Sequence, residues 1–144
     1  SLHMTYDTTL AWSNGLNKIN KVLAAEKDVV VYFVVRDPLE AIKSSFARAK
    51  ERGRFIKLDI LVDMHITARD NILKAIDLYS RDKRVFISFI DNTGKKSSGL
   101  SDVSLLNKMN YENLQQRALK ALEQEYKNGN ITEKVYRGIL GKID

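Results

Sequence analysis

A seven-residue apolar run, Val29 to Val35, is the clearest hydrophobic feature of the chain. It does not alternate with polar residues, and most of its members are β-branched, which is typical of a strand covered on both faces. A second run, residues 84–90, has the same character. Because strands of this kind occur in parallel sheets, the pattern predicts a parallel pair in which 29–35 is a central strand.

Segments with helical spacing lie before the first run and between the two runs. Apolar residues recur at intervals of three and four, which predicts amphipathic helices over residues 14–26, from Pro38 to a stop at Gly53, and over 58–80. The start of the second of these helices is well specified, since Asp37 can cap the helix and Glu40 completes a capping box. Strands that alternate with helices predict an α/β domain with a parallel sheet and crossover helices.

The two ends of the chain complete the predicted organisation. Residues 1–4 have no pattern of their own and are interpreted as a vector remnant, while 5–10 predicts a short strand parallel to one of the other two. A turn-rich loop is expected over 91–102. Residues 103–144 predict a C-terminal helical hairpin, with one helix over 111–127 and a last helix from Thr132. The α/β domain therefore spans 5–102.

Composition narrows the function classes. The chain has no cysteine, which excludes disulfides, thiol catalysis and cysteine metal sites, and its two histidines are too few for a histidine-rich metal site. We predict no metal site in this chain. No apolar run is long enough to cross a bilayer and no signal peptide is seen, so no membrane partner and a cytoplasmic location are expected.

The net charge of +6 raises the question of a nucleic-acid partner. The basic residues are spread over several predicted helices, and no aromatic-interleaved basic strand is seen. This distribution favours ordinary solvated helix faces, although a basic nucleic-acid-binding domain stays open as an alternative.

Polar residues at strand ends are the first candidates for chemistry, because ligands of open parallel sheets bind beyond the carboxyl ends of the strands. Helix capping explains Asp37, and turn chemistry explains Asp91 with Asn92. Arg36 stands at the same strand end as Asp37. Asp7 and Thr9 have no such structural explanation, and we expect both to point into a cleft.

Two arginines, Arg54 and Arg69, follow on or beside the helices after the first apolar run. Guanidinium groups bind phosphate oxygens in pairs, so the two side chains together suit a phosphate. We expect both to approach the carboxyl side of the sheet, close enough to contact one anion. His65 lies one helical turn before Arg69 and could face the same site, although a solvent-facing or partly buried helix histidine is the favoured interpretation.

The order of four short motifs resembles the C-terminal half of the zeta-toxin P-loop kinases. The motifs are Asp7-Thr-Thr-Leu10, the strand and helix start over 31–41, Glu51-Arg-Gly-Arg54, and Ala68-Arg-Asp-Asn-Ile72. The resemblance covers about residues 5 to 92. It implies a partial P-loop kinase fold.

The resemblance also implies an activity. Kinases of this family move the γ-phosphate of ATP, with Mg²⁺, to a hydroxyl of a nucleotide sugar such as UDP-N-acetylglucosamine, and a small antitoxin protein inhibits them. By motif position, Asp7 and Thr9 would belong to the substrate site, and Arg54 and Arg69 would hold the ATP phosphates.

This chain departs from the family pattern in several places. Thr8 replaces the usual Gly, Lys57 replaces the expected Pro, and no Gly-x-x-x-x-Gly-Lys-Ser/Thr loop or upstream acidic base is found. We therefore expect the chain alone to have no catalytic residues of its own, to hold no cofactor and to be inactive. A non-catalytic binding or scaffold module that keeps the fold is the alternative.

The missing half is itself an expected partner. A P-loop half contributes central strands, so its absence predicts a sheet with an exposed edge that pairs with another chain, including a second copy of this one.

Overall fold

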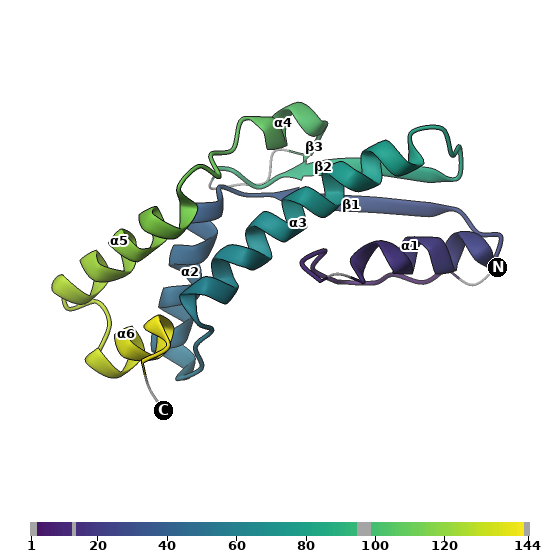
Figure 1. The fold of residues 1–144 in the computed structure, drawn as a ribbon. Helices are drawn as coiled ribbons and strands as arrows, with labels where there is room; N and C mark the ends of the chain where they lie inside the picture. The colour runs from purple at the N-terminus through teal and green to yellow at the C-terminus, as the bar shows by residue number, and fades with distance from the viewer. Residues whose placement is uncertain (1–2, 13, 95–98, 143–144) are drawn as a thin grey trace.

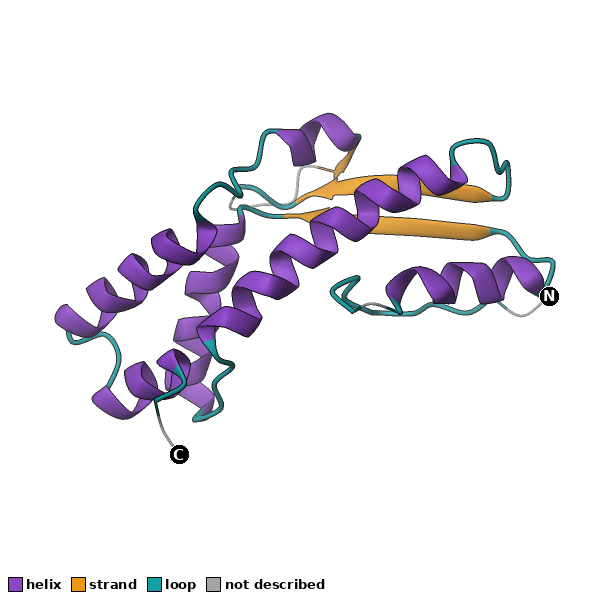
Figure 2. Cartoon of the chain, in the orientation of Figure 1, coloured by secondary structure: helices purple, strands orange, loops and turns teal. Residues whose placement is uncertain are grey.

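The computed structural model describes residues 3–12, 14–94 and 99–142 (Figure 1). In chain order the elements are α1 (Gly15–Ala24), β1 (Val29–Val35), α2 (Pro38–Arg52), α3 (Leu58–Tyr79), β2 (Val85–Asp91), β3 (Gly99–Ser101), α4 (Val103–Asn107), α5 (Leu114–Lys127) and α6 (Glu133–Leu140). The fold is therefore mixed α/β, with an open sheet at one end and a group of helices at the other (Figure 2).

The parallel pair predicted from the two apolar runs is confirmed. β1 and β2 run parallel in register, from Val29 opposite Val85 to Val35 opposite Asp91. The short strand β3 lies within the predicted 91–102 loop and pairs antiparallel with the end of β2, so the sheet is not wholly parallel. In the described residues the strand order is β1-β2-β3, which places β1 at the edge. The prediction that 29–35 is a central strand is wrong for this structure.

The two faces of β1 differ in their burial. Val31, Phe33 and Val35 pack into a core with α3, whereas Val30, Tyr32 and Val34 are each more than half exposed. The apolar run therefore alternates in burial although it does not alternate in polarity. Coverage on both faces was predicted, but the described helices that contact these strands pack against one face only.

The segment predicted as a strand over residues 5–10 has no strand structure. Lys18 of α1 contacts Thr8 and the ring of Tyr6, and at the end of the segment the side-chain amide of Asn71 in α3 donates hydrogen bonds to the carbonyl oxygens of Leu10 and Trp12. A strand forms only where a neighbouring strand pairs with its backbone groups. This segment contacts α1 and α3 instead of a strand, and the strand prediction is wrong.

Helix α2 begins and ends where its sequence signals predict. The carboxylate of Asp37 accepts a hydrogen bond from the backbone N–H of Glu40 at 2.9 Å, and Gly53 adopts the left-handed conformation that ends the helix, with φ of 64°. The Glu40 side chain does not close the capping box and pairs with Lys43 at 3.1 Å. α3 then returns towards the sheet over 22 residues.

Two hydrophobic cores lie along α3. The helical core joins α2 and the first half of α3 to α5 and α6, and includes Phe46, Leu61 and Leu122. The sheet core joins the second half of α3 to the inner sides of β1 and β2 and to α4, and includes Ile72, Phe89 and Leu106. Helices were predicted for both parts of the C-terminal segment that α5 and α6 occupy, and the five-residue α4 was not predicted.

Candidate functional site

Two polar residues, Arg36 and Asp37, follow directly on the carboxyl end of β1. Val35, 1% exposed, fixes the end of the strand in the sheet core, and the exposed Arg36 follows it directly. A terminal nitrogen of Arg36 donates a hydrogen bond to the Ser44 hydroxyl in α2 at 2.7 Å. Asp37 is committed to the α2 cap. The guanidinium of Arg36 is therefore tethered at the strand end and open to solvent.

Helix α3 brings His65 and Arg69 to the same end of the sheet, one helical turn apart. The guanidinium carbon of Arg69 lies 4.5 Å from the ring centroid of Tyr111, which precedes α5, in a cation–π contact. Nε and one terminal nitrogen of Arg69 donate to the carboxylate of Asp70, at 3.0 and 2.9 Å. Arg69 is thus held on two sides.

Electrostatic effects connect several of these groups. Burial lowers the pKa of His65, and the charge of Arg36 lowers it further. Burial raises the pKa of Tyr111, while Arg69 lowers it and Asp37 and Asp70 raise it. The group formed by Arg36, His65, Arg69 and Tyr111 is called the arginine cluster below.

Arg54 lies elsewhere. It is exposed in the loop between α2 and α3, and the next residue, Phe55, packs against Gly138 of α6. Arg69 is eleven residues beyond Leu58, the first residue of α3, a rise of about 16 Å along the helix axis. The α2–α3 turn points away from the sheet (Figure 1), so the structure does not bring Arg54 and Arg69 to one phosphate as predicted.

Asp7 and Thr9 are both exposed. Thr8 between them donates a hydrogen bond to the carbonyl oxygen of Thr9 at 3.2 Å and accepts one from Lys18 at 3.1 Å. Because Asn71 holds Leu10, the end of this segment lies beside α3 two residues beyond Arg69. Thr9 directly precedes Leu10, whereas Asp7 lies three residues before it.

The turn after β2 behaves as its sequence predicts. The carboxylate of Asp91 accepts hydrogen bonds from the backbone N–H and the hydroxyl of Thr93, at 2.9 and 2.6 Å. Such contacts stabilise a turn. The sequence analysis placed Arg36 at a strand end without assigning it a role, and its exposure beside His65 appears only in the folded chain.

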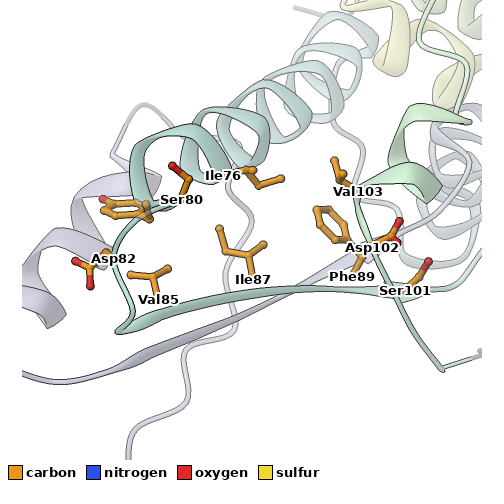
Figure 3. Close-up of a pocket in the computed structure, with 10 residues that line it drawn as sticks. Ile76, Ser80, Asp82, Val85, Ile87, Phe89, Ser101, Asp102 and Val103 are labelled. Carbon is orange, nitrogen blue, oxygen red and sulfur yellow. The ribbon is translucent and has the colours of Figure 1, made fainter.

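An open cavity of about 330 Å³ lies on the inner side of the sheet (Figure 3), and no residue of the arginine cluster lines it. Its floor is formed by Val85, Ile87 and Phe89, with Asp82 and Asp102 at its two ends. Both carboxylates already have partners. Asp82 pairs with Arg84 at 2.9 Å and Asp102 caps α4 through the backbone N–H of Ser104 at 2.9 Å, and these bonds lower the pKa of each carboxyl group.

Two kinds of site are absent from the part of the chain that the structure describes. No helix there is long and apolar enough to cross a membrane. No group of three or more His, Cys, Asp or Glu side chains there could hold a metal ion.

Comparison with known proteins gives one family. The sequence pattern described as Zeta toxin matches residues 2–98, a stretch that includes β1, α2, α3 and β2. No curated protein matches the chain. Since the family match covers more than half of its length, the chain belongs to the zeta-toxin family of kinase-like toxins.

Proposed function

We propose that this chain is the phosphate-contacting and substrate-contacting part of a kinase that transfers the γ-phosphate of ATP to a hydroxyl of a nucleotide sugar, such as UDP-N-acetylglucosamine. The observation that carries the proposal is the zeta-toxin match over residues 2–98. The arginine cluster at the carboxyl end of β1 supports it, because phosphoryl transfer depends mainly on positioning and on charge stabilisation.

The described residues fit part of what ATP requires. Arg36 and Arg69 offer guanidinium donors suited to phosphate oxygens, and bound ATP would supply the phosphoryl group. The chain has no Gly-rich loop with its Lys to surround the β- and γ-phosphates. The proposal therefore gives this chain the guanidinium contacts and gives the phosphate-binding loop and the Mg²⁺ ligands to a second segment.

The roles of the remaining family positions are part of the proposal. By family position, Asp7 and Thr9 contact the acceptor sugar nucleotide, and their segment ends on α3, the helix that also carries Arg69. Arg54, in the turn distant from the sheet, would reach ATP only after the α2–α3 turn moves towards the sheet. A small antitoxin would inhibit the assembled enzyme.

The open side of the sheet supports a partner segment. Four apolar side chains on one face, Val30, Tyr32, Val34 and Phe86, are 54–59% exposed, and we call them the outer sheet face. β1 pairs with a strand on one side only in the described chain, so the backbone groups of its other edge are free for pairing. We propose that the P-loop-bearing segment adds a strand to this edge, which completes a P-loop kinase fold, and covers the face.

A phosphotransfer assay with Mg²⁺, ATP and UDP-N-acetylglucosamine tests the function. It is run on this chain alone and on the complete product of its gene, with phosphorylated sugar nucleotide as the readout. We expect product only from the complete protein. Product from this chain alone would refute the need for a second segment, and a complete protein that binds ATP but phosphorylates no sugar nucleotide would refute the assignment.

A binding or scaffold role is the second candidate, and the outer sheet face is the observation that favours it. A complete gene product that forms a stable complex through this face and has no kinase activity would support that role. Self-association of this chain through β1 would identify the occupant as a second copy.

A further inference from the structure

We propose that two copies of this chain form a two-fold dimer, in which the open edges of β1 pair antiparallel with Tyr32 opposite Tyr32 of the second copy. The two sheets then become one continuous sheet. The inference goes beyond the proposed function and does not depend on it, because it concerns this chain without the second segment. In the complete protein that segment takes the same edge, so the two partners exclude each other.

The first support is the direction of the backbone groups of β1. Two hydrogen bonds at the ends of the strand, from the N–H of Val29 to the carbonyl oxygen of Arg84 and from the N–H of Asn92 to that of Val35, are each 2.8 Å long. Between these ends β1 and β2 run parallel in register, and the two-residue repeat of such a ladder directs the odd-numbered residues of β1 to β2.

The even-numbered residues of β1 therefore turn their N–H and C=O groups to the open edge. Among the described residues, none of these groups has a hydrogen-bond partner. The residues concerned are Val30, Tyr32 and Val34. The open edge thus offers three residues with both backbone groups ready to pair.

The second support is the symmetry of these positions about Tyr32. In an antiparallel pair, the residues whose backbone groups face the partner strand lie opposite one another. A pairing centred on Tyr32 sets Val30 opposite Val34 of the second copy, so every free group on both edges gains a partner. The three side chains are each more than half exposed, and the same pairing places them side by side on the outer sheet face.

The third support is the charge beyond the two ends of β1. Asp28 lies four residues before Tyr32 and Arg36 lies four residues after it, and both are exposed. The pairing centred on Tyr32 therefore sets Asp28 opposite Arg36 of the second copy, once at each end of the paired strands. Opposite charges across an antiparallel pair stabilise it.

The same charges disfavour other registers. A pairing centred on Val31 would set Asp28 opposite a valine and would shorten the paired stretch. A pairing centred on Phe33 would do the same to Arg36. One terminal nitrogen of Arg36 bonds Ser44 at 2.7 Å, which leaves Nε and Nη1 for a carboxylate of the second copy.

Charge exchange tests the register. Sedimentation velocity at micromolar concentrations should show a monomer–dimer equilibrium for the unchanged chain. Asp28→Arg should weaken the dimer by about 5- to 30-fold, because it sets two arginines opposite each other at both ends. Adding Arg36→Asp to the same chain should restore the dimer, since the pairs form again with their charges exchanged. Asp63→Arg, which changes an exposed acid of α3, is the matched control and should leave the dimer unchanged.

Cysteine cross-linking tests the geometry, because the chain has no cysteine of its own. Tyr32→Cys should give a disulfide-linked dimer under mild oxidation, since hydrogen-bonded neighbours in an antiparallel pair have Cα atoms about 5.5 Å apart, a separation that a disulfide can span. Val30→Cys should not cross-link with itself. It should cross-link with Val34→Cys when the two variants are mixed.

A proline at the centre of the edge tests the backbone pairing. Tyr32→Pro removes an N–H that faces the open edge and none that the pairing with β2 uses, so it should abolish the dimer and keep the fold, which far-UV circular dichroism checks. A dimer that survives this change would overturn the edge pairing.

A chain that stays monomeric at high micromolar concentrations would overturn the dimer. A charge-exchanged double variant that is not restored, or Val30→Cys that cross-links with itself, would overturn the register centred on Tyr32. None of these results bears on the proposed function, because phosphotransfer is measured on the complete protein.

Discussion

Gly138 lies in α6 where this helix meets the loop between α2 and α3. A Cβ atom added to Gly138 would lie 2.4 Å from two ring carbons of Phe55. The ring therefore occupies the space of the missing side chain. Phe55 neighbours Arg54, so this contact also holds the turn that carries the displaced arginine.

Gly138→Ala should lower the free energy of unfolding by about 1–3 kcal/mol, because the methyl group overpacks the contact with Phe55. In a helix without such a contact the same change stabilises by about 0.5–1 kcal/mol. The sign of the change in unfolding free energy therefore shows whether the contact with Phe55 is present. Urea unfolding measures the effect. Phe55→Leu is the control background, in which the penalty should shrink, and a stabilised Gly138→Ala variant would contradict the contact.

His65 predicts a pH dependence of stability. Burial and Arg36 lower its pKa in the folded state below the ordinary value of 6.5, so the unfolded chain binds the proton more readily. The stability gained by keeping His65 neutral in the folded state is present in full above pH 6.5. It is lost as the pH falls from 6.5 towards the lowered pKa.

Unfolding free energies measured between pH 5 and 8 check this. We expect His65→Gln to flatten the fall in stability below pH 6.5, and Arg36→Gln to reduce it, whereas His3→Gln should leave the curve unchanged. An identical slope in the wild type and in His65→Gln would show that other groups cause the acid sensitivity.

Helix α2 links the end of β1 to the helical core, and its start was predicted from local residues alone. The Asp37 cap, the Pro38 start and the Gly53 stop all act within a few residues of the helix end, so tertiary packing was not needed to identify them. The 5–10 segment was predicted on equally local grounds and failed, because a strand needs a partner elsewhere in the chain.

Asp37→Ala should lower the free energy of unfolding by about 0.5–2 kcal/mol, because the backbone N–H of Glu40 loses its acceptor. Asp37→Asn should retain most of the cap. Guanidinium unfolding of the two variants, with the exposed Asp63→Ala as control, measures the difference. Equal losses for alanine and asparagine at position 37 would mean that the charge, rather than the capping oxygen, stabilises the helix.

In the part of the chain that the structure describes, two cores are joined along α3 and one sheet face has no cover. Phe86 and Phe89 lie on the same strand, three residues apart, yet Phe86 is 59% exposed on the outer sheet face and Phe89 is 2% exposed in the sheet core. Substitutions at these two positions therefore separate the contribution of the sheet core to stability from that of the outer sheet face.

Phe89→Ala should cost about 3–5 kcal/mol of unfolding free energy, as expected for a buried aromatic side chain. Phe86→Thr should change stability by only about 0.5 kcal/mol, because the side chain is mostly solvated, and should reduce self-association through the exposed apolar patch. Thermal unfolding and sedimentation velocity measure the two effects. A large loss of stability in Phe86→Thr would show that this face is already covered in solution.

The sequence by itself determined α2 and α3 with their ends, the two apolar strands β1 and β2, and the family to which the chain belongs. It also predicted that the two strands run parallel, from their unbroken apolar character and the helices between them. Periodicity, capping and turn chemistry act over a few residues, and a motif order can be read without a fold. These signals say little about which segments meet.

Only the tertiary structure decided the positions that depend on distant segments. It placed β1 at a sheet edge with one exposed face, laid residues 10–12 on α3, and turned Arg54 away from the sheet while setting Arg36 beside His65. A helical hairpin separates residues that are close in sequence, and a strand end gathers residues that are distant. The physical reason is that an apolar run shows how much surface must be buried, while the neighbour that buries it comes from elsewhere in the chain or from a partner.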